Sequence, residues 1–97
     1  MANKYYQRSY RAERKAFKKL ENAGYRCIRA SSSKGPADII AISKEHVRLI
    51  EVKVKDSYKN IKKSVDEKIL KELEVPEYVS REVWYWILNE GWRIVQF

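Results

Sequence analysis

The stretch Leu49-Ile50-Glu51-Val52-Lys53-Val54 decides the fold and the chemistry of this chain. Its apolar, mostly β-branched residues alternate with charged ones, a pattern that predicts a strand. Because Glu51 and Lys53 are two residues apart, both side chains lie on one face of that strand, and the apolar residues pack the other. Burying such charges costs several kcal/mol unless they pair or hold a metal. With a second carboxylate upstream, Asp38, the pattern suggests phosphodiester hydrolysis.

The composition is that of one small folded domain over residues 1–97. Hydrophobic residues make up 44% of the chain and charged residues 35%, which is typical of a globular protein and not of a disordered tail. No apolar run approaches the roughly 20 residues that span a bilayer, and residues 1–6 contain no apolar region of signal-peptide type. The lone Cys27 cannot form an internal disulfide, so we expect a small buried side chain in a reducing compartment.

The positive charge is concentrated in the first third of the chain. Residues 1–34 contain ten Lys or Arg against two acids, whereas residues 35–97 contain eleven of each sign. A basic segment of this kind binds polyanions. A solubilising helix face or an anionic membrane surface are the alternatives, but the apolar stripe of this segment is narrow and a core would consume it. The distribution therefore predicts binding to DNA or RNA and no membrane association.

The pattern of apolar residues and turn signals predicts an α-β-β-β-α-β-β order, an α/β fold with a mixed sheet. We expect a helix at 9–23 that ends at Gly24, a strand at 25–30, and a loop at 31–36. Strands at 37–43 and 46–55 should form an antiparallel hairpin. A second helix at 56–73 follows from an apolar residue at every fourth position, and strands at 82–88 and 92–97 close the domain. The four apolar residues of that helix are Ile61, Val65, Ile69 and Leu73.

Two further acids and one histidine are informative. Glu13 lies on the apolar stripe of the first helix, so it should face the sheet near the other acids. Asp38 opens an apolar strand directly after Gly35-Pro36, which places it at a strand end. Alone, Glu13 would usually be a salt-bridge partner, Asp38 a turn-capping residue, and Glu-x-Lys a chance spacing in a charged chain. His46 has no clustered partners, and we expect an exposed turn residue.

Together these features resemble the PD-(D/E)XK nuclease superfamily and, more closely, the archaeal and viral Holliday junction resolvases of the Hjc type. The matching segments fall in the expected order and span nearly the whole chain. They are Arg11-Ala12-Glu13-Arg14, Gly24-Tyr25-Arg26-Cys27-Ile28-Arg29, Ser33-Lys34-Gly35-Pro36-Ala37-Asp38-Ile39-Ile40-Ala41, Ile50-Glu51-Val52-Lys53 and Gly91-Trp92-Arg93.

The resemblance implies a restriction-endonuclease-like core and a Mg²⁺-dependent, dimeric nuclease that acts on four-way DNA junctions inside a prokaryotic or virus-infected cell. Mn²⁺ is the expected substitute for Mg²⁺. The implied active-site residues are Glu13, Ser33, Asp38, Glu51 and Lys53, with Asp38, Glu51 and Glu13 at the metal. From the charge distribution we expect phosphate contacts from Lys4, Arg8, Arg11, Lys15, Arg29 and Lys34.

A homodimer is expected because two strands of a symmetric junction must be cut. The last hairpin is crowded with aromatic residues, which favours an interface there; the alternative is that they fill both faces of the core. The crowded residues are Trp84, Tyr85, Trp86, Trp92 and Phe97. Two other functions remain open: another endonuclease of the superfamily, of the flap, nicking or repair type, and a non-catalytic, dimeric nucleic-acid-binding module.

Overall fold

The computed structural model describes residues 4–30, 36–59 and 65–97 as one helix–sheet–helix unit. The order of the elements is the predicted one. They are α1 (Lys4–Asn22), β1 (Arg26–Arg29), β2 (Ile39–Ile42), β3 (Val47–Lys55), α2 (Val65–Glu72), β4 (Val79–Ile87) and β5 (Gly91–Gln96). None of the helices described is long and apolar enough to cross a membrane.

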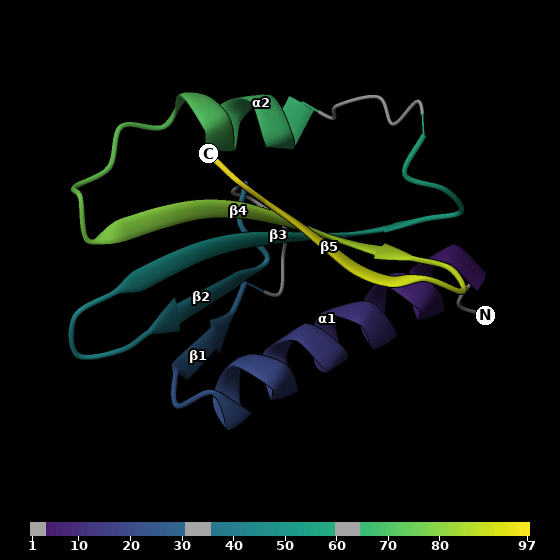
Figure 1. Ribbon diagram of the computed structural model, residues 1–97, viewed down its shortest axis with the longest axis horizontal. Coiled ribbons are helices and arrows are strands. Elements are labelled where there is room, and N and C mark those ends of the chain that lie inside the picture. Colours follow the sequence, from purple (N-terminus) through teal and green to yellow (C-terminus); the bar gives the residue numbers. More distant parts are fainter. Residues whose placement is uncertain (1–3, 31–35, 60–64) are drawn as a thin grey trace.

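The five strands form one mixed sheet in the order β1-β2-β3-β4-β5 (Figure 1). The pairs β1–β2, β2–β3 and β4–β5 are antiparallel, and β3–β4 is parallel. Parallel neighbours need a crossover connection, and α2 lies in that connection. The predicted hairpins are both confirmed.

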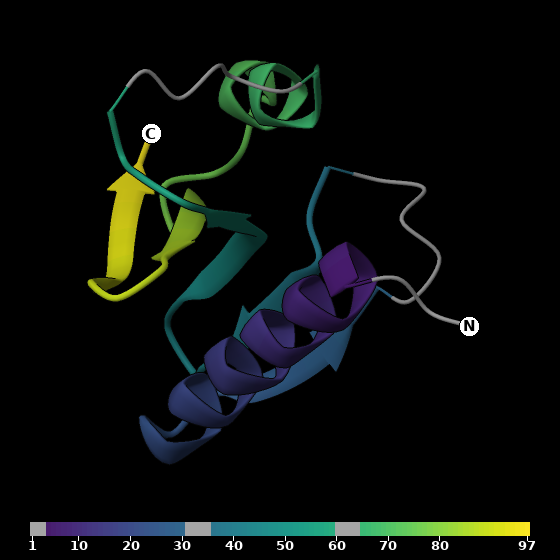
Figure 2. The same cartoon turned by 90° about the vertical axis from the view of Figure 1, so that its right-hand side faces the viewer.

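The alternation in β3 divides the sheet into two faces. Ile50 and Val52 belong to a core that includes Ala16 and Leu20 of α1. Leu49 packs on the other side, against a core built around Leu70 of α2. Figure 2 accordingly shows the two helices on opposite sides of the sheet. Glu51 and Lys53 alternate with Ile50 and Val52, so they belong to the α2 face.

Residues with a left-handed backbone conformation end α1 and form the turn between β4 and β5. Gly24 has φ +98° after α1, and the Tyr25 N–H donates to the Leu20 carbonyl at 3.1 Å, which closes the helix. In the β4–β5 turn, Asn89 and Gly91 have φ of 67° and 101°. Gly24 as the helix stop is therefore confirmed.

The second helix differs from the prediction in length and in rotation. The described helix starts at Val65, and the chain just after β3 forms a bend where the Lys59 N–H donates to the Ser57 hydroxyl. Such local bonds compete with helix formation. Glu67 and Leu70 are buried, whereas Ile69 and Leu73 of the predicted apolar stripe are 47% and 39% exposed. A bond from Tyr85 to Glu67, described below, fixes this rotation.

The aromatic residues of the last hairpin lie mostly inside the domain. Trp84 and Tyr85 are 2% and 5% exposed and lie in the two separate cores. Trp92 packs edge-on against both Trp84 and Trp86, with ring centroids 5.4 and 5.0 Å apart. Trp84 and Tyr85 therefore fill the two cores, as in the alternative given above, whereas Trp86, Trp92 and Phe97 are half-buried. An interface at this hairpin stays a prediction.

Candidate active site

Glu51 and Lys53 form an ion pair on the α2 face of β3. The Glu51 Oε1 and Lys53 Nζ atoms are 2.9 Å apart, and the side chains are 3% and 29% exposed. The carboxylate is therefore buried while the ammonium reaches the surface. Removing a carboxylate from water is costly, and the paired ammonium offsets that cost. The positive charge therefore lies at the surface of the site, with the negative charge buried beneath it.

Asp38 is bound to both residues that flank Glu51. Its N–H donates to the Ile50 carbonyl at 2.8 Å, and its Oδ2 accepts the Val52 N–H at 2.7 Å. The paired part of β2 starts one residue later, at Ile39, so the Asp38 carboxylate takes the place of a backbone acceptor at the strand entry. The sheet thereby holds Asp38 beside Glu51.

Tyr85 and Glu67 form a wall of the site that the sequence did not predict. Tyr85 is the partner of Lys53 in the β3–β4 register, and its hydroxyl donates to the Glu67 Oε1 at 2.6 Å. Burial first, then the hydrogen bond and the charge of Glu67, raise the pKa of Tyr85, and the charge of Glu51 adds to the shift. The phenol therefore stays protonated and donates to the α2 carboxylate.

Glu13 faces inward from α1, as predicted, but its described contact is with Arg29. The Arg29 Nη2 donates to the Glu13 Oε2 at 3.1 Å, and the Glu13 side chain is 19% exposed. Arg29 ends β1, and the next residue, Ala30, donates its N–H to the Asp38 carbonyl. Glu13 is thus one ion pair removed from the strand end that carries Asp38. Its part in a metal site stays a prediction.

The donor set at Asp38 and Glu51 fits a magnesium ion. Mg²⁺ prefers oxygen ligands, keeps several waters and takes only one or two carboxylates from a protein. Within residues 4–30, 36–59 and 65–97, no group of three or more His, Cys, Asp or Glu side chains is arranged to hold a metal. The fit therefore rests on two carboxylates, with water for the remaining positions.

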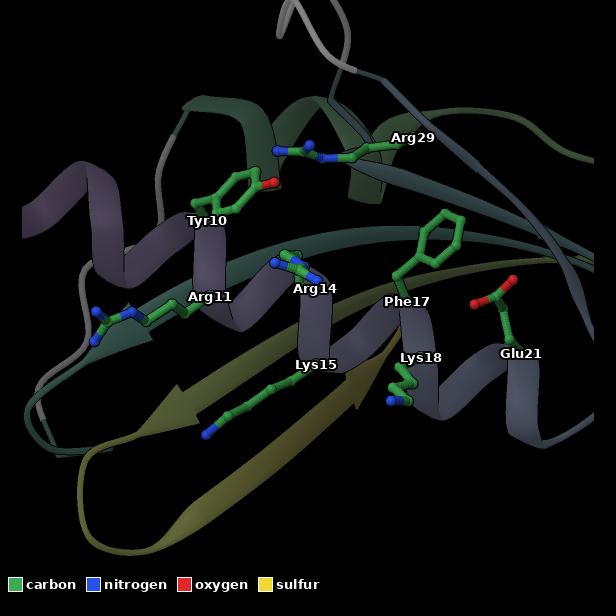
Figure 3. A pocket seen from close by; sticks show the side chains of 8 residues that line it. All are labelled: Tyr10, Arg11, Arg14, Lys15, Phe17, Lys18, Glu21 and Arg29. Atoms are coloured by element: carbon green, nitrogen blue, oxygen red, sulfur yellow. The ribbon is translucent and has the colours of Figure 1, made fainter. Parts of the chain in front are cut away.

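The predicted phosphate contacts lie on α1 and β1. Arg8 and Arg11 are exposed, Lys15 Nζ lies 4.1 Å from the ring centroid of Trp86, and the Arg29 guanidinium lies 4.7 Å from that of Tyr10. A hollow of about 750 Å³ lies over this helix and does not include the Glu51–Lys53 pair. Figure 3 shows Lys15 and Lys18 on one flank of α1, with Tyr10, Phe17 and Arg29 on the other.

Three predicted residues lie wholly or partly outside the described structure. Ser33 and Lys34 lie outside the described residues. Lys4 opens α1, but its side chain also lies outside what the structure describes. Their roles stay predictions.

His46 lies at the β2–β3 turn, as predicted, but it is half-buried and belongs to a polar network, so the predicted exposure is wrong. Its Nε2 lies 3.1 Å from the Ser80 hydroxyl, which itself donates to the Glu82 carboxylate at 2.7 Å. Because a serine has one proton to donate, His46 Nε2 must be the donor in the first bond. Arg48 adds two bonds to Glu82, at 2.6 and 2.8 Å, and the Trp84 indole adds a third donor group.

The sequence and the fold are both similar to those of known proteins. A family model described as archaeal Holliday junction resolvase (Hjc) matches residues 4–95. The chain belongs to the archaeal Holliday junction resolvase family. A solved structure of Archaeoglobus fulgidus Hjc, a Holliday junction resolvase from an archaeal hyperthermophile, is similar with a TM-score of 0.73 and 25% sequence identity, over 90% of this chain and 70% of that one. No curated protein has a significantly similar sequence.

Membership in the Hjc family confirms three predictions made from the sequence. The fold is the PD-(D/E)XK nuclease core, and the chain is a nuclease that resolves Holliday junctions and therefore binds branched DNA. Resolvases of this family depend on a metal. Asp38, Glu51 and Lys53 lie together within this fold. Tyr85 lies beside them through the β3–β4 register, and Glu67 through its hydrogen bond with Tyr85.

Proposed function

We propose that this Hjc family member is a Mg²⁺-dependent endonuclease in which Asp38, Glu51 and Lys53 form the active site. The observation that carries the proposal is the buried Glu51 carboxylate, which pairs with Lys53 and has Asp38 bonded to both of its neighbours. Mn²⁺ should substitute for Mg²⁺. We expect the protein to act inside the cell, on DNA.

Each residue has a distinct part in the proposed reaction. Bound Mg²⁺ would supply a water of lowered pKa and positive charge at the phosphate. Asp38 and Glu51 would hold that ion, and the sheet fixes both carboxylates before substrate arrives. Lys53 would orient the attacking water or stabilise the charge of the transition state, as a compact charge on a flexible side chain. Glu13 would complete the metal shell through water, and Ser33 would contact the cleaved strand.

Two strands of a four-way junction must be cut, so we propose a C2-symmetric homodimer with one active site in each protomer. The support is an uncovered apolar surface rather than the aromatic hairpin. Ile28 of the edge strand β1 and Ile42 of β2 are 54% and 37% exposed, and Ile69 of α2 and Leu73, just after α2, are exposed as well. A second copy of this chain would bury them. Sedimentation of the wild type against Ile69→Lys checks this: a monomeric wild type would contradict it.

A cleavage panel tests the proposed reaction. Four-way junction, flap, nicked duplex and plain duplex are each incubated with Mg²⁺, with Mn²⁺ and with EDTA. The proposal predicts paired cuts in the junction with either metal, none with EDTA, and no cleavage by Asp38→Asn. Equal cleavage of the flap would point to the other nuclease class, and undiminished cleavage by Asp38→Asn would contradict the assignment of the site.

A further inference from the structure

The basic segment and the catalytic pair lie on different faces of the sheet. Arg29 reaches Glu13 of α1, and Lys15 lies over Trp86, which packs against the α1 core. Glu51 and Lys53 lie on the α2 face, with Tyr85 beside them. Cations that hold DNA directly beside Lys53 should therefore come from the α2 face, although residues 35–97 have no net charge.

One arginine occupies that position. Lys53 pairs with Tyr85 in the β3–β4 register, and Tyr85 pairs with Arg93 in the β4–β5 register. The three residues therefore form a row across three strands, on one face of the sheet. Neighbouring strands are about 4.8 Å apart, so Lys53 and Arg93 start about 10 Å from one another. Figure 1 shows β3 ending and β5 beginning at the same end of the sheet.

The Arg93 guanidinium is held by an aromatic stack. It lies 4.4 Å from the ring centroid of Tyr58, and the Tyr58 ring packs edge-on against Tyr85, with centroids 5.8 Å apart. Tyr85 is in turn fixed by its hydrogen bond to Glu67. A stacked guanidinium keeps the N–H groups along its edge available for a phosphate.

Nothing in the described chain neutralises this arginine. Arg93 is exposed, and none of the three ion pairs found among residues 4–30, 36–59 and 65–97 includes it. Arg29, Arg48 and Lys53 each have a carboxylate partner. An exposed, oriented cation that forms no ion pair with any described acid, in line with a catalytic lysine, suits a polyanionic ligand.

We propose that Arg93, held on the ring of Tyr58, binds a backbone phosphate of the cleaved strand within about two nucleotides of the scissile phosphate. The range follows from the separation of Lys53 and Arg93. DNA rises about 3.4 Å per nucleotide along its axis, and successive phosphates of one strand are further apart than this rise because the strand also winds around the axis. Tyr58 and Tyr85 are positioning residues that act through Arg93. The inference rests on the proposed active site at Asp38, Glu51 and Lys53.

The test measures junction binding in EDTA, so that cleavage does not enter. Replacing Arg93 by Ala should weaken binding about tenfold and lower the salt slope by about 0.9, the value for one phosphate contact. Arg93→Lys should recover part of the loss. Tyr58→Phe should bind the junction as tightly as the wild type does. Tyr58→Leu should lose about half of the binding free energy that Arg93→Ala loses. Lys68→Ala, on the exposed surface of α2, removes the same charge as a matched control.

Neutral methylphosphonates placed singly along the cleaved strand then locate the contact. In the wild type, one position within about two nucleotides of the cut should weaken binding about tenfold, and in Arg93→Ala that position alone should lose its effect. Identical profiles in the two proteins, or an equal loss in Lys68→Ala, would overturn the proposal. Failure of the proposed active site would be seen separately, as metal-dependent cleavage that survives Asp38→Asn.

Discussion

Two buried glutamates on neighbouring strands, Glu82 on the α1 face and Glu51 on the α2 face, are each 2% exposed but have different surroundings. Glu82 accepts two hydrogen bonds from Arg48 and one each from Ser80 and Trp84, all inside the domain. Glu51 pairs with a lysine that reaches the surface. Burial of a carboxylate therefore does not by itself indicate an active site. What distinguishes Glu51 is that its charged partner, Lys53, reaches the surface.

The pKa of Glu82 reflects its rigid set of donors. Burial alone would raise it, but the hydrogen bonds from Arg48, Ser80 and Trp84 outweigh burial and lower the pKa below its ordinary value of 4.5. The bond to Glu82 correspondingly raises the pKa of Arg48. We infer that this network holds the N-terminal parts of β3 and β4 together and takes no part in the reaction.

The largest expected effect falls on Lys53. Lys53→Ala should slow single-turnover junction cleavage at least about hundredfold, the scale for removing one group that stabilises developing charge, while junction affinity in EDTA stays near that of the wild type. Arg48→Ala, which removes a cation from the other face, should cleave at the wild-type rate at temperatures where it is folded. Equal losses in the two variants would remove the distinction between the faces.

A second prediction concerns stability on the α1 face. Glu82→Leu should lower the free energy of unfolding by about 2 to 3 kcal/mol, because it leaves a mostly buried guanidinium without its acid. The double variant Arg48→Met/Glu82→Leu should recover most of that loss, since a well-packed apolar pair replaces the ions. Urea unfolding measures both. A double variant as unstable as the single one would show that the ion pair is not the source of the effect.

The third prediction is a pH dependence with a defined sign. The folded protein holds the Glu82 proton more weakly than the unfolded chain, so the stabilisation is complete above pH 4.5, the ordinary value. It is lost as the pH falls through the lower pKa of the folded state. Unfolding free energies measured from pH 6 downward should fall less steeply in Glu82→Gln than in the wild type. If the unfolding free energy fell equally steeply with pH in both proteins, the pH dependence could not be assigned to Glu82.

The smallest effects belong to single surface cations. Arg11→Ala should weaken binding about equally for all DNA sequences and lower the salt slope by about 0.9. Lys71→Ala, on α2, should leave the slope unchanged. Salt titrations of junction binding compare the two, and a larger change for Lys71 would mean that the basic segment does not carry the phosphate contacts.

Local patterns predicted most of the fold. The alternation around Glu51 identified β3, the helical stripe identified α1, and turn residues identified both hairpins, because each signal lies within about ten residues. The second helix was less predictable. A local bond at Ser57 forms where a helix was predicted, and the distant Tyr85–Glu67 bond sets the rotation of α2. Neither follows from apolar spacing.

The same limit applies to the site. Asp38, Glu51 and Lys53 could be identified because their spacing and their strand positions are readable along the chain. Tyr85, Glu67 and the His46 network could not, because the parallel β3–β4 register brings together residues about 32 positions apart. The one available signal was a glutamate, Glu67, three residues before the apolar Leu70, on the same side of a helix.

The most direct test of the account replaces each of the two buried glutamates, one at a time, by a neutral glutamine of nearly the same shape. Glu51→Gln and Glu82→Gln are compared for Mg²⁺-dependent cleavage of a four-way junction and for thermal unfolding. The account predicts that Glu51→Gln loses cleavage but keeps a midpoint at or above that of the wild type, whereas Glu82→Gln keeps cleavage when folded and unfolds at a lower temperature. Full cleavage by Glu51→Gln would contradict it.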